Sequence, residues 1–444
     1  MRNVLRNILL VSHSDFPTNS AVHVHHFANE LVKMGLDCVV AVPKDKNSIH
    51  SLNRTNLYKV TQYNEYQTIT DFFDNKQPPD LVHCWTPREH VRIYCKQLSQ
   101  HYSFRLVVHL EDNEEAVTAR LLQNPSSQWE ATEGRKMSSC LSHPQHSKEF
   151  LRHANGVTVI IDTLQQLIPY PLPRLTVYPG VDTSQFYPRR KNSQLLSHFS
   201  IPPHATIICY TGNVYATNVA EVRSLYLAVG KRNREGKPTY LIRTGIDYTP
   251  LLTPQEDWIR KYLIELGWVE REKIPEILSL ADVLIQPGKS DEFNDYRFPS
   301  KIPEFLAMGI PVILPDTNIA KFLTHGENAL ILPVVNEETI PPAIDLLLNN
   351  PSLRQRLIKG GLHFVYNYLN WQKNTRQLLD FYQSLFPDNK KFIPLENSLY
   401  HSQKCHESHP SQERQLPLYS LKLGNLRQKL QIFSIFSRRN YSDC

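Results

Sequence analysis

Short apolar runs alternate with amphipathic stretches along most of the chain. Asn7–Val11 and Cys38–Val42 are apolar runs without polar alternation, which is typical of strands that helices cover on both faces of a parallel sheet. Between them, apolar residues recur at i, i+3, i+4, i+7 and i+8, and predict a helix with Ser20 as N-cap and Gly35 at its end. Three further runs of the same kind are Pro79–Trp85, Arg105–Asp112 and Gly156–Asp162.

The alternation stops at Val177–Arg190, where prolines and a glycine break the pattern, and then restarts. The sequence therefore predicts an α/β protein with two doubly wound domains, 1–178 and 179–370, followed by a helix at 371–385 that packs back on the body and a flexible basic tail at 386–444. The polar stretch Gln123–Ser147 predicts a long loop. The second set of expected strands is Ala205–Gly212, Pro238–Gly245, Gly267–Val269, Ala281–Gly288, Gly309–Pro315 and Ala329–Pro333.

The net charge of +6 is too small to imply a nucleic-acid partner, and residues 401–444 hold most of the excess, with seven Lys/Arg against three Asp/Glu. The basic amphipathic segment 421–439 predicts peripheral contact with the inner membrane face, the alternatives being a solvated tail or a helix that docks on the protein. Seven scattered cysteines without a C-x-x-C pair favour reduced thiols and a cytoplasmic protein. The apolar run Ile8–Val11 is too short for a signal peptide.

Several common nucleotide and hydrolase motifs are absent from the sequence: the P-loop, G-x-G-x-x-G, Asp-x-Asp and G-x-S-x-G. The stretch Gln286–Asp316 carries chemistry instead. An expected strand ends at Pro287, a charged loop follows, and a helix begins near Ser300, whose N-terminal amides favour a phosphate. Lys301 in the first turn is unfavourable unless an anion binds there. Glu304, one turn on, either accepts hydrogen bonds from sugar hydroxyls or only complements the helix dipole.

Pro303–Ile313, PEFLAMGIPVI, resembles a characteristic stretch of the group 1 (family 4) retaining glycosyltransferases of the GT-B fold, and the resemblance runs from about Asn7 to Leu385. In that family two acidic residues stand eight positions apart. Glu304 takes the second position, and PGKSDEF puts Asp291 in the first, 13 residues away, with Asp295 as the competing candidate.

Other segments resemble the same family. Pro179–Pro188 resembles the start of its donor-binding domain, and Leu266–Pro287 resembles the segment in which backbone near Val269 meets the nucleotide base. The first helix carries His23 where the family often has His, and Arg105–Asp112 carries His109 over as the active-site histidine. Two features depart from the family, because Thr18-Asn19 replaces Gly-Gly in the acceptor loop and no Arg or Lys follows Gly212-Asn213.

The resemblance implies a hexosyltransferase that moves a sugar from a nucleotide-diphosphate sugar to an acceptor hydroxyl, retaining, metal-independent and without another cofactor. Two Rossmann-like domains would face a cleft, the N-terminal one presenting a glycan, lipid-linked or small-molecule acceptor, for example in the synthesis of a cell-envelope polysaccharide. Two alternatives remain: a non-catalytic GT-B relative that binds a glycan or a protein, and a sugar-nucleotide epimerase.

The resemblance also assigns roles to residues. His109 would contact the transferred sugar, Glu304 the ribose, and Asp291 or Asp295 the sugar hydroxyls. The diphosphate charge would be met by Arg243, Arg297 or Lys301. Asn213 either contacts the donor or caps a turn. No metal site is expected, because His23, His25 and His26 point in different directions on a helix. The acidic cluster Glu111, Asp112, Glu114 and Glu115 either holds acceptor hydroxyls or is solvated surface.

Overall fold

The computed structural model describes residues 5–16, 18–122 and 138–386, all within one compact unit that spans residues 1–396. The expectations for the tail at 387–444, including membrane contact through 421–439, lie outside the described residues, as does most of the predicted loop. The end of that loop is a correction, because Pro144 begins a helix with proline in its first turn, where proline's missing N–H costs nothing.

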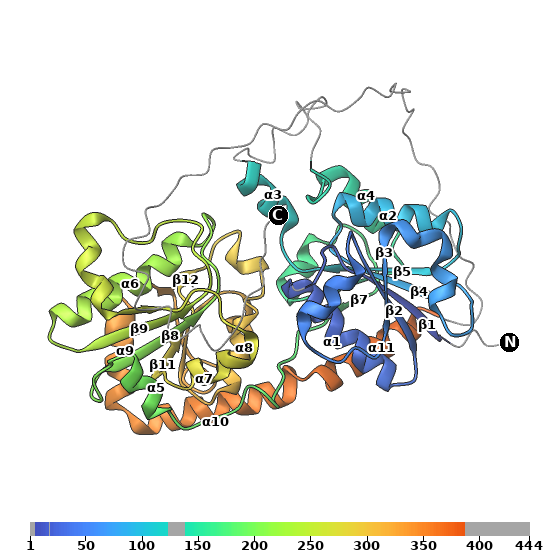
Figure 1. The fold of residues 1–444 in the computed structure, drawn as a ribbon. Helices are drawn as coiled ribbons and strands as arrows, with labels where there is room; N and C mark the ends of the chain where they lie inside the picture. The colour runs from blue at the N-terminus through green and yellow to red at the C-terminus, as the bar shows by residue number, and fades with distance from the viewer. Residues whose placement is uncertain (1–4, 17, 123–137, 387–444) are drawn as a thin grey trace. The chain divides into compact units, whose positions relative to one another are not determined.

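The first half of the chain forms a seven-stranded parallel sheet in the order β3-β2-β1-β4-β5-β6-β7 (Figure 1). Five of its strands lie where the apolar runs predicted them. The two edge strands β3 and β7 escaped prediction because they are short and carry few buried side chains. The strands are β1 Asn7–Val11, β2 Asp37–Val42, β3 Lys59–Gln62, β4 Leu81–Trp85, β5 Arg105–Leu110, β6 Gly156–Val159 and β7 Arg174–Thr176.

The second half forms a six-stranded parallel sheet in the order β10-β9-β8-β11-β13-β14, so the predicted α/β class with two doubly wound sheets is confirmed. The strand expected at Gly267–Val269 is wrong, because Gly267 has a φ of 67° and turns the chain after an earlier strand. The strands are β8 Thr206–Thr211, β9 Thr239–Thr244, β10 Leu263–Glu265, β11 Val283–Ile285, β13 Val312–Pro315 and β14 Leu330–Leu332, with a small antiparallel pair, β12 Gly288–Lys289 and β15 Val334–Val335.

Helices connect the strands of both sheets. The first of them, α1, begins one residue before the predicted cap, because the Thr18 hydroxyl rather than Ser20 accepts from the Ala21 N–H. The α-helices are α1 Asn19–Lys33, α2 Glu89–Ser99, α3 Glu114–Leu122, α4 Pro144–Arg152, α5 Ser193–His198, α6 Val219–Arg234, α7 Ile274–Leu278, α8 Lys301–Ala307, α9 Ile340–Asn349, α10 Pro351–Tyr368 and α11 Trp371–Ser384. Short 3₁₀ helices lie at Lys46–Leu52, Tyr63–Phe72, Asp162–Leu167, Pro254–Tyr262, Arg271–Lys273, Asn294–Tyr296 and Asn318–Phe322.

The last two helices tie the halves of the chain together. Helix α10 packs on α8 of the second half, whereas α11 packs on α1 of the first half. Leu378, Leu379 and Tyr382 of α11 are buried in the same hydrophobic cluster as β1, β2 and α1. The N-terminal core is therefore completed by a helix from the far end of the described chain.

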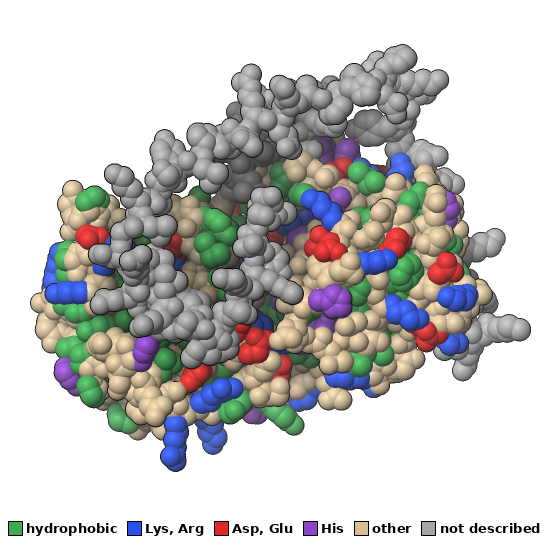
Figure 2. Space-filling view, viewed as in Figure 1, with side chains coloured by type: hydrophobic (Ala, Val, Ile, Leu, Met, Phe, Trp, Pro, Cys, Tyr) green, Lys and Arg blue, Asp and Glu red, His purple; other side chains and the backbone are tan. Residues whose placement is uncertain are grey.

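The surface of the described residues is mixed in charge. Figure 2 shows Lys and Arg side chains interspersed with Asp and Glu on one face. The five cysteines among the described residues are all free thiols, and none of the described helices is long and apolar enough to span a membrane.

A glycine with positive φ follows each of three strands that lie side by side in the C-terminal sheet. Gly212 (131°), Gly245 (109°) and Gly267 (67°) follow β8, β9 and β10, and the Gly245 N–H donates to the Gly267 carbonyl at 2.7 Å. A Cβ atom on Gly245 would lie 2.3 Å from the Gly212 carbonyl oxygen. Position 245 therefore requires glycine for this close approach, whereas at Gly212 and Gly267 glycine is favoured by the positive φ.

We expect Gly245→Ala to lower the free energy of unfolding by more than Gly236→Ala does. Gly236 also has a positive φ, 72°, but a Cβ atom added there would meet no atom within 4 Å. Gly236→Ala should therefore lower the free energy of unfolding only by the cost of placing alanine in a left-handed conformation, about 1–2 kcal/mol. Gly245→Ala adds a clash with the backbone to that cost. Urea unfolding of both variants measures the difference, and equal losses would contradict the close packing of the strand ends.

Candidate active site

His109 stands near the carboxyl end of β5, in the interior of the N-terminal half. Its side chain is 2% exposed, its Nδ1 lies 2.8 Å from the Thr158 hydroxyl, and its ring centroid is 4.7 Å from that of Trp85. Burial lowers the pKa of His109 to about 4, although the nearby Glu111 carboxylate acts in the opposite direction. His109 is therefore a neutral imidazole at pH 7.

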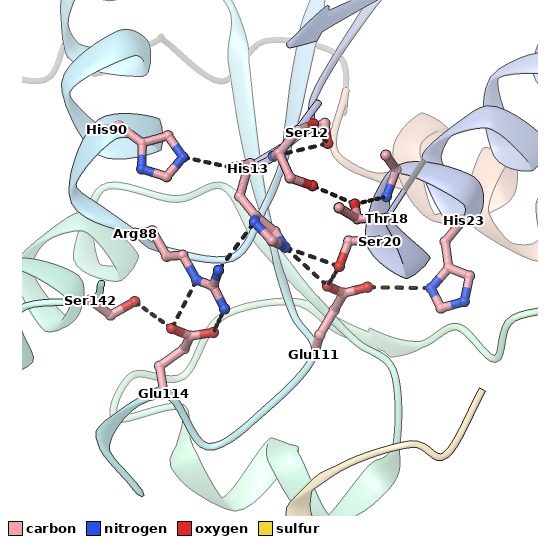
Figure 3. A network of polar contacts seen from close by, with 12 residues as sticks. Ser12, His13, Thr18, Ser20, His23, Arg88, His90, Glu111, Glu114 and Ser142 are labelled. Atoms are coloured by element: carbon pink, nitrogen blue, oxygen red, sulfur yellow. Dashed lines mark hydrogen bonds and ion pairs between the residues drawn. The ribbon is translucent and has the colours of Figure 1, made fainter. Parts of the chain in front are cut away.

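Glu111, two residues after His109, is a buried carboxylate surrounded by histidines (Figure 3). Its Oε1 lies 3.3 Å from His23 Nδ1, the Ser20 hydroxyl donates to its Oε2, and His13 Nε2 lies 3.8 Å from that same Oε2. Burial alone would raise the pKa of Glu111, but the hydrogen bond and charge of His23, followed by His109 and His13, lower it to about 2. The carboxylate is thus ionised and fixed in place.

A second buried carboxylate, Glu114, continues the network on the other side of His13. Arg88 makes a two-point contact with Glu114, at 3.2 and 3.3 Å, and its Nη1 lies 3.2 Å from His13 Nδ1. Ser142 donates to Glu114 at 2.9 Å. Solvated surface is therefore the wrong interpretation for Glu111 and Glu114, although their residue type and spacing alone could not exclude it.

Asp112 lies between these two carboxylates in the sequence, and its pKa is shifted in the direction opposite to that of Glu111. Burial raises the pKa of Asp112 to about 7, with further contributions from Glu114 and Glu111 that exceed the opposing effects of Arg88 and Arg297. A carboxyl group that titrates near neutral pH can exchange protons at the edge of this network.

Lys301 is the predicted phosphate-binding cation that the C-terminal half leaves available. Its Nζ has no carboxylate partner among the described residues, donates to the Tyr210 hydroxyl at 3.0 Å and lies 4.4 Å from the Tyr210 ring centroid. A Cβ atom on Gly212 would stand 3.3 Å from that Nζ, so the glycine leaves the ammonium approachable. Lys301 is the first residue of helix α8, which has seven residues.

The two arginines predicted beside Lys301 are already engaged. Arg243 is 2% exposed, pairs with Asp247 and donates to the Gly212 carbonyl at 3.3 Å. Arg297 pairs with Glu221 at 3.1 Å and lies over the Phe293 ring. Arg243 therefore lies at the same strand ends as Lys301 and shapes the glycine turn, but its charge is compensated within the protein.

Glu304, the predicted ribose ligand, is buried and paired with Arg271, whose Nη2 lies 2.5 Å from its Oε1. Arg271 was not predicted. Its only signal in the sequence is a cation two residues after Val269, in the segment that the resemblance places at the nucleotide. Val269 itself is half-buried and packs on the hydrophobic core, which leaves its backbone as the part able to meet a base.

The two candidates for the first acidic residue both hydrogen-bond within their own surroundings. Asp291 Oδ1 accepts from the N–H groups of Phe293 and Asn294 at 2.9 and 2.6 Å. Asp295 accepts from Ser290 and Thr317 at 2.7 and 2.5 Å. Burial opposes it, but these hydrogen bonds and Lys321 hold the pKa of Asp295 below its usual value. The choice between Asp291 and Asp295 stays open.

The acceptor-side candidates meet the C-terminal half at the start of α1. Asn19 Nδ2 donates to Ser300 Oγ at 3.2 Å, while Thr18 caps the helix. A cavity of about 30 Å³, enough for a water molecule or a hydroxyl group, lies beside them and is lined among others by His23, His26, Asp182, Arg271, Ser300 and Glu304.

The structure thus brings Asn19, His23 and Glu304 around one cavity, and Gly212, Arg243 and Lys301 to one set of strand ends. Asn213 is used by its own turn, since its Oδ1 accepts from the Ile246 N–H at 2.9 Å and its Nδ2 donates to Tyr215 at 3.1 Å. The three histidines of α1 have separate partners: His23 contacts Glu111, His25 contacts Tyr58 and His26 contacts Arg54.

Solved structures share this fold over most of the chain. Sucrose-phosphate synthase from Thermosynechococcus elongatus aligns with a TM-score of 0.63 at 16% identity, over 86% of this chain and 99% of that one. Alr3699/HepE of Anabaena, in complex with UDP and glucose, aligns with a TM-score of 0.62 at 13% identity, over 85% and 100%. These likenesses show the fold, which is GT-B, as predicted.

Residues 205–350 match the family model described as Glycosyl transferases group 1. Alpha-D-kanosaminyltransferase from Streptomyces kanamyceticus is 25% identical over 96 residues, which are 21% of this chain; the match spans about a quarter (24%) of that protein's length. The predicted resemblance to group 1 glycosyltransferases is therefore confirmed, and the sequence match that carries it lies in the C-terminal half.

Stability should fall as the pH is lowered from 6.5 to 4, because several buried histidines are held neutral. Burial and the charge of Arg88 lower the pKa of His13 to about 4, against the effect of Glu111. Below pH 6.5 the His13 side chain binds a proton in the unfolded chain but stays unprotonated in the folded state. The free energy of unfolding then drops by about 1.4 kcal/mol per pH unit for each such proton.

His13→Asn should make this pH dependence shallower, as measured by urea unfolding at pH 7, 6, 5 and 4. His198→Asn, which makes the same replacement at an exposed position, serves as the control for the substitution itself. An identical slope in His13→Asn and the unchanged protein would show that His13 is not held neutral in the folded state.

Proposed function

We propose that this protein is a glycosyltransferase that moves a sugar from a nucleotide-diphosphate sugar to an acceptor hydroxyl with retention of anomeric configuration. The observation that carries the proposal is the Lys301 ammonium, which has no carboxylate partner among the described residues and stands beside Gly212 at the carboxyl edge of the C-terminal sheet. Ligands of doubly wound sheets bind at this edge. The group 1 family match over residues 205–350 includes both residues.

Lys301 would act on the leaving group. As the bond between the anomeric carbon and the diphosphate oxygen breaks, negative charge grows on the diphosphate, and a cation held in place stabilises that charge in the transition state. The hydrogen bond to Tyr210 keeps the ammonium at the strand ends before the donor binds. Because Arg243 and Arg297 are compensated by Asp247 and Glu221, Lys301 would supply most of the net positive charge.

Glu304 would hold the ribose. Arg271 fixes Oε1 of the carboxylate, which leaves Oε2 as the acceptor for a ribose hydroxyl. The pair also lowers the cost of keeping a buried negative charge near a diphosphate. His109, neutral at pH 7, would contact the transferred sugar from the N-terminal half, and Asp291 or Asp295 would hold its hydroxyls.

The acceptor would approach from the N-terminal half. The network around Glu111 offers hydroxyl, imidazole and carboxylate groups next to the cavity that His23 lines, which suits an acceptor rich in hydroxyl groups. A glycan, a lipid-linked sugar or a small molecule all fit this chemistry. We propose retention and metal independence from the family resemblance, and a cytoplasmic site of action. UDP is the first nucleotide to test because Alr3699/HepE was solved with it.

A thermal-shift screen with UDP, GDP, ADP and CMP and their sugar conjugates tests donor binding. A nucleotide at 100 times its Kd should add about 2.7 kcal/mol to the free energy of unfolding. Release of nucleoside diphosphate that depends on an added acceptor would then establish transfer. Binding without release would favour a non-catalytic relative, and conversion of the donor sugar without acceptor would favour an epimerase.

Lys301→Ala should weaken binding of the selected nucleoside diphosphate by roughly 10- to 150-fold, since a hydrogen bond to a charged group contributes about 1.5–3 kcal/mol. Binding of the corresponding nucleoside, which lacks phosphates, should change little. Lys231→Ala is the matched control, because Lys231 pairs with Glu338 on the exposed surface of the same half. Equal affinities of Lys301→Ala and Lys231→Ala for the diphosphate would contradict the assignment.

Glu304→Ala should weaken the same nucleotide by a similar factor of roughly 10 to 150, for the same reason, but through the ribose. The loss of affinity should therefore vanish when the ligand is the 2′,3′-dideoxy analogue. Calorimetric titration of the unchanged protein and the variant with each of the two ligands measures this. If the variant loses as much affinity for the dideoxy analogue as for the ribonucleotide, Glu304 does not bind the ribose hydroxyls.

A further inference from the structure

A chain of buried hydrogen bonds leads from the C-terminal helix to His109. The Tyr382 hydroxyl of α11 lies 2.5 Å from His83 Nδ1, and His83 Nε2 lies 2.8 Å from the Thr158 hydroxyl. That hydroxyl lies 2.8 Å from His109 Nδ1. All four side chains are buried, so water does not supply alternative partners along the chain.

All members of this chain are uncharged at neutral pH. Burial, with a smaller contribution from His109, holds the pKa of His83 well below its usual range, and burial raises the pKa of Tyr382 well above its usual range. His109, with its pKa near 4, is neutral as well. Each imidazole therefore carries one N–H, and the question is on which nitrogen.

The hydroxyl hydrogen of Tyr382 determines which groups donate and which accept along these hydrogen bonds. Among the described residues, His83 Nδ1 is the single side-chain partner of the Tyr382 hydroxyl, and a buried O–H without an acceptor costs about 1–3 kcal/mol. Tyr382 therefore donates to His83 Nδ1. His83 must then carry its hydrogen on Nε2 and donate it to Thr158.

The same reasoning continues through Thr158. Its hydroxyl has one hydrogen and two partners, His83 Nε2 and His109 Nδ1. Since it accepts from His83, its hydrogen goes to His109 Nδ1. His109 is then left with its hydrogen on Nε2, the nitrogen for which the described residues provide no partner. The reverse direction would leave the Tyr382 hydrogen without an acceptor.

We propose that Tyr382, His83 and Thr158 are positioning residues that fix His109 as the Nε2–H tautomer, a hydrogen-bond donor to the substrate. The inference rests on the proposed function for its consequence in catalysis, but the tautomer itself does not depend on it. In that role His109 donates to an oxygen of the transferred sugar or of the leaving group and does not accept a proton. Tyr382 of helix α11 thereby determines the tautomer of His109 on β5.

Long-range ¹H–¹⁵N NMR of the protein labelled with ¹⁵N-histidine reads the tautomer directly. The His109 signals are assigned by their loss in His109→Gln. We expect Nε2 to show the shift of a protonated nitrogen and Nδ1 that of an unprotonated one at pH 7. A protonated Nδ1 would overturn the proposal, whether or not the protein has transferase activity.

Thr158→Val tests the hydrogen-bond relay formed by Tyr382, His83 and Thr158, because it removes both the donor to His109 and the acceptor for His83. The His109 shifts should move toward those of a tautomer mixture, and Thr158→Ser should restore them because serine keeps the hydroxyl. Thr118→Val is the matched control, since Thr118 is also a buried threonine and its hydroxyl has no hydrogen-bond partner among the described residues. An unchanged Nε2–H signal in Thr158→Val would show that the relay does not fix the tautomer and would overturn the inference.

Kinetics separate positioning from folding once a donor is known. Thr158→Val should lower kcat by roughly 10- to 100-fold, the range found when a metal-bound histidine loses its outer hydrogen-bond partner, with a much smaller change in KM for the donor. Tyr382→Phe should have a weaker effect in the same direction. Tyr94→Phe is its control, because the buried Tyr94 hydroxyl has no partner among the described residues. If KM rises while kcat stays, the relay does not position a group for the transition state.

Discussion

A buried polar group must keep a hydrogen-bond partner, and this requirement organises the N-terminal half of the protein. The parallel sheet is covered on both faces, so the histidines and carboxylates at the ends of β1, β4 and β5 have little access to water. They therefore bind one another, in the network around Glu111 and in the relay that ends at His109. Helix α11 belongs to both the apolar core and the relay, and the fold of this half depends on its docking.

The C-terminal half follows a different constraint, close approach of backbone at the strand ends. Glycines with positive φ follow β8, β9 and β10, and Gly245 lets the turn after β9 pack directly against the Gly212 backbone after β8. In this arrangement Arg243 donates a hydrogen bond to the Gly212 carbonyl, and the Lys301 ammonium lies beside Gly212. Arg243 and Arg297 are paired with carboxylates, so Lys301, without a carboxylate partner among the described residues, is the group that we propose for binding the diphosphate.

The sequence predicted those features that depend on local pattern. Continuous apolar runs located the central strands of both sheets. The place of Lys301 in the first turn of a helix, and the family resemblance for Glu304 and His109, predicted these three as site residues. The edge strands β3 and β7 lack such runs, and the strand expected at Gly267–Val269 does not form because Gly267, with its positive φ, turns the chain after β10. These failures share a cause, because edge position and positive φ are set by tertiary contacts.

Residues whose role depends on distant partners could not be predicted in this way. Arg271 pairs with Glu304 across 33 positions, and Tyr382 meets His83 across 299. Nothing in the local sequence of either residue marks the contact. Burial of Glu111 was equally invisible, since a run of acidic residues after a strand more often is solvated surface. The candidate site therefore was half predicted, its motif residues from the sequence and its supporting contacts from the structure alone.

In the proposed function, Lys301 and Glu304 together bind a nucleoside diphosphate. A crystal structure of the protein with the nucleotide that stabilises it most tests this directly. We expect a phosphate oxygen within hydrogen-bond distance of Lys301 Nζ and a ribose hydroxyl on Glu304 Oε2, with Arg271 still on Oε1. A nucleotide bound elsewhere, with Lys301 still on the Tyr210 hydroxyl, would contradict it.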